Sequence, residues 1–388
     1  DWSSDVCSSD LSKVEILREM EYAVTHIRER VLDEKARGHK VIGCLPILIP
    51  EELVHASGAF PVGIWGAERL PIVRAAEYYP PYACSVVQSI TELAIAGAYD
   101  GLDGVLISCL CDTLKCVTQS FPLTCPSVKP IFVKHPQNHR LEGAVTYFIR
   151  ELEGVRAQLE TLTGRQITEE ALCQSIEIYN ENRKEMIAFA RLLAEKPGLL
   201  TCRERHTVIK ARYFMRKEEH TRLMRELNGM LRASTAPSFE GIKVYVSGVM
   251  LEPSHILDVM DELGYTIVGD ELAHESRQFN HLVPEALSQL ERLARQVQTY
   301  EGEAFLYDPR KTRGERVARA AKEAGADAVL FALMKFCDTD EYDLPWVRCA
   351  AQEADLPFLH LELEQTMQSA EPLRTRLQAF AEQLTHTC

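Results

Sequence analysis

Three cysteines of the sequence stand where a thiol could bind a metal. Cys111 lies just past the apolar run GVLIS, in SCLCDTLKC, and Cys337 lies just past AVLFALM, in MKFCDTDEYD. Cys84, in YYPPYACSVVQS, follows a proline-rich loop and opens an expected helix. Backbone N–H groups and the dipole at a helix N-terminus favour thiolate and cluster sulfide. Three such thiolates predict an iron–sulfur cluster with one iron left for a non-protein ligand, or a zinc ion with an open position.

Taken alone, each strand-end cysteine is more often a packing residue, because Cys is among the most buried residue types. Three cysteines at matching positions favour ligation instead. Cys109 and Cys116 flank Cys111 and are interpreted as core thiols or as neighbours behind the ligands, while Asp112 and Asp338 are expected to cap the helices that follow. The remaining cysteines are interpreted as structural or exposed: Cys44, Cys125, Cys173, Cys202, Cys349 and Cys388.

Two further segments carry candidate acids and bases. In PEELVH, the side chains of Glu51, Glu52 and His55 could act beside a cluster, although carboxylates in a proline-initiated first turn more often stabilise the helix dipole. Glu52 is retained as a candidate catalytic residue. In VKHPQN, His135 could meet a substrate or a partner, or could end a strand in a turn, and both interpretations stay open.

Two regions alternate short apolar runs with helix-length segments, which predicts parallel sheets covered by helices on both faces. The first region spans residues 39–150, with expected strands at 41–45, 60–66, 104–108 and 130–136. The second spans residues 236–388, with expected strands at 243–248, 265–270, 304–309, 328–334 and 358–363. The fold class is therefore α/β, with two flavodoxin-like doubly wound domains whose ligands bind beyond the carboxyl ends of the strands.

The other segments connect or precede these domains. Residues 12–38 have apolar positions at helical spacing and predict one amphipathic helix, and residues 151–235 predict an all-helical bridge. Residues 1–11 read DWSSDVCSSDL, which looks like a translated sequencing adapter, so this tail and its Cys7 are left out of the argument.

Composition excludes several classes of function. The 388 residues are 46% hydrophobic and carry a formal net charge of −14, which argues against a surface that neutralises nucleic-acid phosphates. No apolar run approaches the roughly 20 residues that span a bilayer, and no signal peptide is recognisable, so a cytoplasmic protein is expected. In such a protein, 12 cysteines indicate metal or redox chemistry, or buried thiols, before disulfides.

From about Val14 to its end, the sequence resembles the β subunits of the 2-hydroxyacyl-CoA dehydratases, a family related to benzoyl-CoA reductase subunits. The segments that carry the resemblance are IGCLPILIPEELVHASGAFPVGIWG, EYYPPYACSVVQS, YDGLDGVLISCLCDTLKC, VKHPQNHRLE, FMRKEEHT, LMKFCDTDEYDLPWVR and LRTRLQAFAE. The resemblance implies one [4Fe-4S] cluster per chain, held by Cys84, Cys111 and Cys337, the same three residues that the topology selects.

The resemblance also implies a reaction and partners. The family removes water from a 2-hydroxyacyl-CoA through a ketyl radical, because the β proton of such a thioester is not acidic enough for ordinary elimination. The implied partners are an α subunit, which completes a heterodimer, and a separate ATP-hydrolysing iron–sulfur activator. This chain lacks a GxxxxGK[ST] loop, so ATP is expected only through that activator. The β subunit's cluster is expected mainly to relay an electron.

Two other functions stay open. A homodimeric electron-transfer protein of the same superfamily, carrying a double-cubane cluster, gains slight support from the nearby Cys109 and Cys116. A zinc-binding or purely structural scaffold without redox activity is the third hypothesis. Counting iron and sulfide in anaerobically purified protein separates the three.

Overall fold

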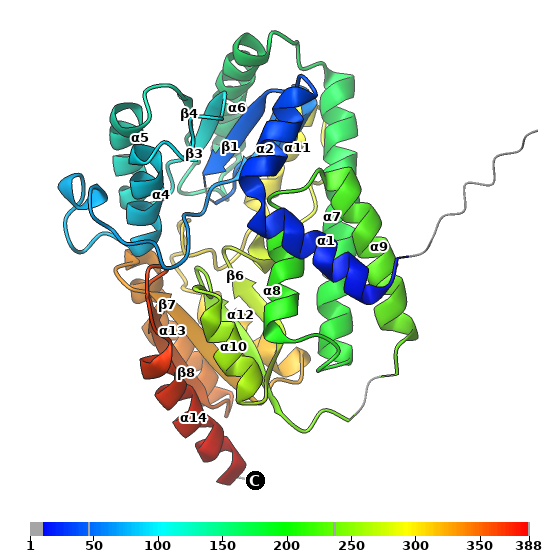
Figure 1. Ribbon diagram of the computed structural model, residues 1–388, viewed down its shortest axis with the longest axis vertical. Helices are drawn as coiled ribbons and strands as arrows, with labels where there is room; N and C mark the ends of the chain where they lie inside the picture. The colour runs from blue at the N-terminus through cyan, green and yellow to red at the C-terminus, as the bar shows by residue number, and fades with distance from the viewer. Residues whose placement is uncertain (1–10, 46, 236–237, 387–388) are drawn as a thin grey trace, which may run out of the picture.

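The computed structural model describes residues 11–45, 47–235 and 238–386 (Figure 1). The expected adapter-derived tail therefore lies, apart from Leu11, outside the described residues, as does Cys388. None of the described helices is long and apolar enough to cross a membrane.

A four-stranded parallel sheet forms the centre of the N-terminal half. Its strands are β1 (Val41–Leu45), β2 (Phe60–Gly63), β3 (Gly104–Ser108) and β4 (Lys129–Val133). They pair in the order β2-β1-β3-β4, and residues of β1 and β3 are almost entirely buried because helices cover both faces. The helices between these strands are α3 (Glu51–Ala56), α4 (Ser85–Ile95) and α5 (Asp112–Thr124), with a 3-10 turn at Ala75–Glu77.

A second four-stranded parallel sheet forms the centre of the C-terminal half. Its strands are β5 (Ile242–Gly248), β6 (Tyr265–Leu272), β7 (Ala328–Met334) and β8 (Phe358–Leu363), in the order β6-β5-β7-β8. The helices of this half are α10 (His255–Glu262), α11 (Gln289–Gln298), α12 (Arg313–Glu323), α13 (Asp338–Glu353) and α14 (Glu371–His386), with a 3-10 turn at Ser276–Gln278. Both sheets share one strand order, so the predicted pair of flavodoxin-like α/β units is confirmed.

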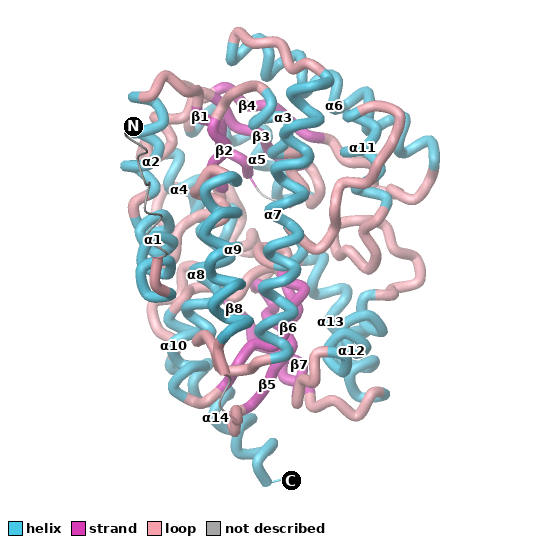
Figure 2. Tube along the Cα trace, turned by 90° about the vertical axis from the view of Figure 1, so that its right-hand side faces the viewer, coloured by secondary structure: helices cyan, strands magenta, loops and turns pink. Residues whose placement is uncertain are grey.

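Four helices follow the first sheet in the sequence, and the longest of them runs past both sheets (Figure 2). They are α6 (Glu142–Thr163), α7 (Glu169–Glu195), α8 (Cys202–Ala211) and α9 (Lys217–Ala233). The helix α7 contacts α3 of the first half and β6 of the second, and α8 contacts α10 and β6. The helix α7 therefore bridges the two halves, whereas α6 packs on β4 and α3 of the first half. The expected boundary between residues 150 and 151 falls inside α6.

Two expected elements differ from the structure. The single helix expected over residues 12–38 is two helices, α1 (Lys13–Thr25) and α2 (Ile27–Ala36), because the backbone leaves the helical region at His26 (φ −116°, ψ 41°). The strand expected at 304–309 is a loop. Its apolar side chains Phe305 and Leu306 are buried in the core cluster of the first sheet, beside α11, which packs on α6. Burial across the junction of the two halves takes the place of burial in the second sheet.

Candidate functional site

Each of the three candidate cysteines is the residue that begins a helix. Cys84 is the N-cap of α4, Cys111 of α5 and Cys337 of α13, each with extended backbone angles. Cys111 follows β3 and Cys337 follows β7, which are the third strands of two sheets with the same order. The two thiols therefore occupy equivalent places at the carboxyl ends of the strands, where doubly wound folds bind ligands.

Cys84 is near enough to each of the other two thiols to affect its pKa. A Cys84 thiolate would raise the pKa of both Cys111 and Cys337, so it interacts with one cysteine from each half of the molecule. The start of α4 also contacts the second half of the molecule. The Ser85 hydroxyl donates to Met334 Sδ at 3.3 Å and accepts a hydrogen bond of 2.9 Å from the backbone N–H of Gln365. The structure thus brings the three predicted residues into one neighbourhood.

Burial dominates the protonation of these thiols. It raises the pKa of Cys111 to about 12 and raises the pKa of Cys84 and of Cys337 as well. The backbone N–H groups of the first helical turn oppose this shift, and the Leu114 N–H donates to Cys111 Sγ at 3.4 Å. Metal-free, the thiols are neutral at physiological pH, and a bound metal would displace their protons.

The donor set can be tested against two kinds of metal centre. A tetrahedral zinc site, with Zn–S near 2.3 Å, needs sulfurs about 3.8 Å apart. Among the described residues, the group whose ligand atoms all lie within 4.8 Å of one another is His206, Glu252 and His274, so the three cysteine sulfurs are spread more widely than that. The three thiols also pack against the apolar core of the first sheet, which would shield a bound group from water.

The backbone beside Cys337 is strained. Phe336 has φ 64°, a left-handed conformation that a non-glycine residue adopts at an energetic cost. Thr339 Oγ1 lies 3.3 Å from Cys337 Sγ and fixes the direction of that thiol. Strain held by surrounding packing is common where a functional group must be positioned.

An open pocket of ≈ 500 Å³ is lined by residues that neighbour Cys111 and Cys337. One wall contains Leu110, which precedes Cys111, and another contains Thr339, which contacts Cys337. Gln137 closes part of the pocket by donating to the Leu110 carbonyl at 3.2 Å, and the loop of residues 304–307 forms the remaining side. The volume is in the range of small-molecule sites.

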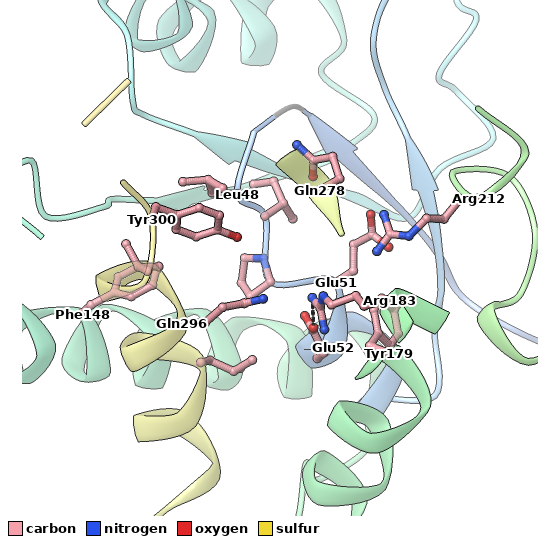
Figure 3. A pocket seen from close by; sticks show the side chains of 14 residues that line it. Leu48, Glu51, Glu52, Phe148, Tyr179, Arg183, Arg212, Gln278, Gln296 and Tyr300 are labelled. Atoms are coloured by element: carbon pink, nitrogen blue, oxygen red, sulfur yellow. Dashed lines mark hydrogen bonds and ion pairs between the residues drawn. The ribbon is translucent and has the colours of Figure 1, made fainter. Parts of the chain in front are cut away.

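The candidate Glu52 lies in another cavity (Figure 3). Its carboxylate is 1% exposed and pairs with Arg183 of α7 at 2.5 Å. The adjacent Glu51 pairs with Lys217 at 2.8 Å; burial alone would raise the pKa of Glu51, but the cations Lys217 and Arg212 outweigh it and lower that pKa. The cavity holds ≈ 30 Å³, enough for one or two water molecules, and none of its lining residues is a cysteine.

The candidate His135 is buried at the end of β4. Its Nε2 lies 2.8 Å from the Leu48 carbonyl, and its ring packs on Phe148. Burial lowers the pKa of His135 to about 4, so the ring is neutral at physiological pH and donates from Nε2. This ring ties the loop after β1 to β4. The catalytic assignments of Glu52 and His135 stay predictions.

Comparison with known proteins identifies the family. Residues 46–384 match the family described as 2-hydroxyglutaryl-CoA dehydratase, D-component. The chain belongs to this family. The resemblance predicted from the sequence is confirmed.

Three curated members of the family match over nearly their whole length. The (R)-phenyllactyl-CoA dehydratase beta subunit of Clostridium sporogenes is 41% identical, over 89% of this chain and 92% of its own. The lactoyl-CoA dehydratase subunit beta of Anaerotignum propionicum is 41% identical, over 96% and 100%. The (R)-2-hydroxyglutaryl-CoA dehydratase subunit beta of Acidaminococcus fermentans is 37% identical, over 90% and 94%. Each is named as one subunit of a dehydratase.

Three expectations about neighbouring residues are corrected by the structure of this family member. Asp112 does not cap α5, because the Cys111 side chain itself accepts the capping N–H, and Asp112 is exposed and paired with Lys115. Asp338 is the first residue of α13, after the N-cap Cys337, whose side chain makes no capping hydrogen bond. Cys116, expected in the core or behind the ligands, is exposed.

Sequence reasoning missed several residues around the cysteines. Gln137 and Thr339 line the open pocket, and the loop of residues 304–307 was interpreted as a strand. The Asp308-Pro309 pair was the available signal, since such pairs favour turns, and the Asp308 carboxylate indeed accepts from the Thr312 N–H at 2.8 Å.

Proposed function

We propose that this chain is the β subunit of a [4Fe-4S] 2-hydroxyacyl-CoA dehydratase, a hydro-lyase that converts a 2-hydroxyacyl-CoA into the 2-enoyl-CoA. The observation that carries the proposal is the neighbourhood of Cys84, Cys111 and Cys337, three helix N-caps contributed by both halves of the molecule. Similarity to three dehydratase β subunits over nearly their full length supports it.

In this proposal the three cysteines hold the cluster as thiolates. A cluster of this kind supplies one electron at low potential, which makes loss of the α-hydroxyl and of an otherwise unreactive β proton feasible. The N–H groups at the starts of α4, α5 and α13 stabilise the negative charge of the ligands. The apolar core behind the thiols excludes water.

The proposal includes partners. An α subunit completes a heterodimer, and a separate ATP-dependent iron–sulfur activator delivers the electron, because this sequence has no GxxxxGK[ST] loop. The open pocket lined by Leu110 and Thr339 suits either the acyl end of a thioester or a side chain of the α subunit. The proposed compartment is the cytoplasm, where the cluster is kept reduced.

The first test is the ligand set. We expect Cys84→Ser, Cys111→Ser and Cys337→Ser each to lose most of the iron and sulfide that the anoxically purified wild type retains, because a buried hydroxyl is a poor iron ligand. Cys116→Ser is the matched control, since its thiol lies one helical turn from Cys111 but is exposed. Loss of iron in Cys116→Ser with retention in Cys111→Ser would reverse the assignment.

The second test is activity. The chain is co-expressed with an α-type subunit and the activator, and an anoxic assay follows formation of enoyl-CoA from aryl, lactoyl, branched-chain and hydroxyglutaryl thioesters. We expect ATP-dependent turnover that is lost irreversibly in air. About four irons per chain would agree with the proposal, whereas about eight with reductase activity and no dehydration would indicate the double-cubane alternative.

A further inference from the structure

A second cluster of metal-ligating side chains lies away from the three cysteines. It consists of His206 on α8, Glu252 in the loop after β5 and His274 in the loop after β6. One ligand atom of each lies within 4.8 Å of the others, and their exposed fractions are 3%, 0% and 1%. The cluster joins the helical bridge to the second sheet.

His274 lacks a hydrogen-bond partner for either ring nitrogen. The ring stacks on Tyr213 with centroids 5.2 Å apart and planes at 2°, and it also packs on Trp65. A buried polar group without a partner costs about 1–3 kcal/mol, so such groups in folded proteins indicate a missing water or ion. With neither ring nitrogen engaged, a neutral imidazole here has a lone pair for a cation.

His206 is oriented as a metal ligand usually is. Its Nδ1 lies 2.8 Å from a Glu275 carboxylate oxygen, and its Nε2 lies 3.2 Å from Glu252 Oε1. Metal-binding histidines commonly donate the second ring N–H to a carboxylate, which fixes the tautomer and raises the basicity of the ligating nitrogen. Glu275 supplies that carboxylate here, and it is itself held by Arg205 at 2.5 Å.

The charges around the cluster leave room for a cation. Four carboxyl groups meet there, from Glu68, Glu252, Asp270 and Glu275, against Arg205, Lys210 and the ring of His206, which lies between Glu252 and Glu275. Lys210 pairs with Glu252 but also lies 3.1 Å from Glu68 Oε1, so its ammonium keeps a partner when Glu252 turns to a metal. Buried carboxylates in excess of cations are stabilised by a divalent ion.

We propose that His206, Glu252 and His274 form a second metal site, which takes a zinc-class divalent cation and pins α8 to the loops after β5 and β6. Two imidazoles and one carboxylate are a common zinc donor set, with a fourth position left for water. The Gln365 amide donates to Glu252 Oε2 at 2.9 Å, and the Gln365 backbone N–H donates to Ser85, the residue after Cys84. The metal would therefore also stiffen the support behind Cys84.

The test is zinc binding by the anoxically purified full chain, treated with a chelator and then titrated with Zn²⁺. We expect about one zinc per chain beside the iron, with a first shell of N and O at about 2.0–2.1 Å by X-ray absorption and no sulfur at about 2.3 Å. His274→Phe keeps the ring on Tyr213 and removes both nitrogens. We expect it to lower zinc affinity at least about 100-fold, the upper end of losses seen even for outer-shell partners.

The controls separate ligation from packing. His255→Phe removes a histidine whose ring nitrogens are also unpartnered but which lies outside the cluster, and we expect zinc binding to be unchanged. Glu252→Gln is a second ligand variant, with iron content and circular dichroism reporting whether each variant is folded. No zinc bound by the wild type, a sulfur shell, or zinc retained by folded His274→Phe would each overturn the proposal.

Discussion

The buried pair of Glu52 and Arg183 shows how a single side chain can be essential without touching substrate. Arg183 is 5% exposed, and its Nε has no partner among the described residues, so Glu52 compensates most of its charge. Removing one partner of a buried ion pair costs about 3–5 kcal/mol. We expect Glu52→Gln to lower the free energy of unfolding by that amount, measured by urea unfolding under anoxic conditions.

The matched control lies on α7, the helix that carries Arg183. Glu181 pairs with Lys184 at 2.7 Å and with Arg225 at 3.0 Å, but all three side chains are about half exposed, and such pairs contribute little. We expect Glu181→Gln to change the free energy of unfolding by less than about 0.5 kcal/mol. A Glu52→Gln protein that is as stable as the wild type yet inactive would instead support the catalytic assignment of Glu52.

Residue chemistry was predictable where a strand ended. The positions of Cys111 and Cys337 followed from apolar runs that stop just before them, and the structure places both at helix N-caps. The cluster of His206, Glu252 and His274 was not predictable in this way. Its members come from one helix and two loops, and no local spacing records that they meet.

Glycine at the end of β5 is required by the neighbouring strand. Gly248 has φ 141°, and a Cβ there would lie 2.2 Å from the Ala332 carbonyl oxygen of β7. We expect Gly248→Ala to cost about 2–3 kcal/mol of stability. Gly229 in α9 has open space around it, so Gly229→Ala should add about 0.5–1 kcal/mol. Equal effects of the two substitutions on the denaturation midpoint would contradict this account.

Most elements were predictable because their periodicity and their burial agree. Eight of the nine expected strands exist, since their apolar runs lie inside a sheet covered on both faces. The ninth, residues 304–309, has the composition of a strand, but Phe305 and Leu306 are buried against the first half of the molecule. Local pattern records that a side chain is apolar and not which core receives it.

At the scale of the whole molecule, one helix of the second half packs in the core of the first half. The helix α11 belongs in sequence to the second half but packs on α6 and α7, and its apolar side chains Leu290 and Leu293 lie in the first core cluster. Contacts of this kind join residues more than a hundred positions apart. The pair of sheets was predictable from strand alternation, whereas this crossing depends on the three-dimensional arrangement alone.

Buried histidines make the whole fold sensitive to mild acid. Burial lowers the pKa of His135, His274 and His281 to about 4 and that of His220 to about 3, all below the usual value of 6.5. Between pH 6.5 and 4 the unfolded chain binds protons that the folded chain does not, so stability is full above pH 6.5 and falls as the pH decreases. Each histidine contributes up to about 1.4 kcal/mol per pH unit.

His206 has the opposite sign, because Glu252 and Glu275 outweigh its burial and raise its pKa. Its contribution to stability is therefore full below pH 6.5 and is lost as the pH rises above that value. We expect urea unfolding between pH 6.5 and 5 to show stability decreasing with acid, and His135→Leu to reduce that slope by up to about 1.4 kcal/mol per pH unit. Phe148→Leu, which removes the ring packed on His135, should lower the free energy of unfolding by an amount that does not change with pH. Identical slopes in the wild type and His135→Leu would mean that the His135 ring titrates alike in the folded and unfolded chains.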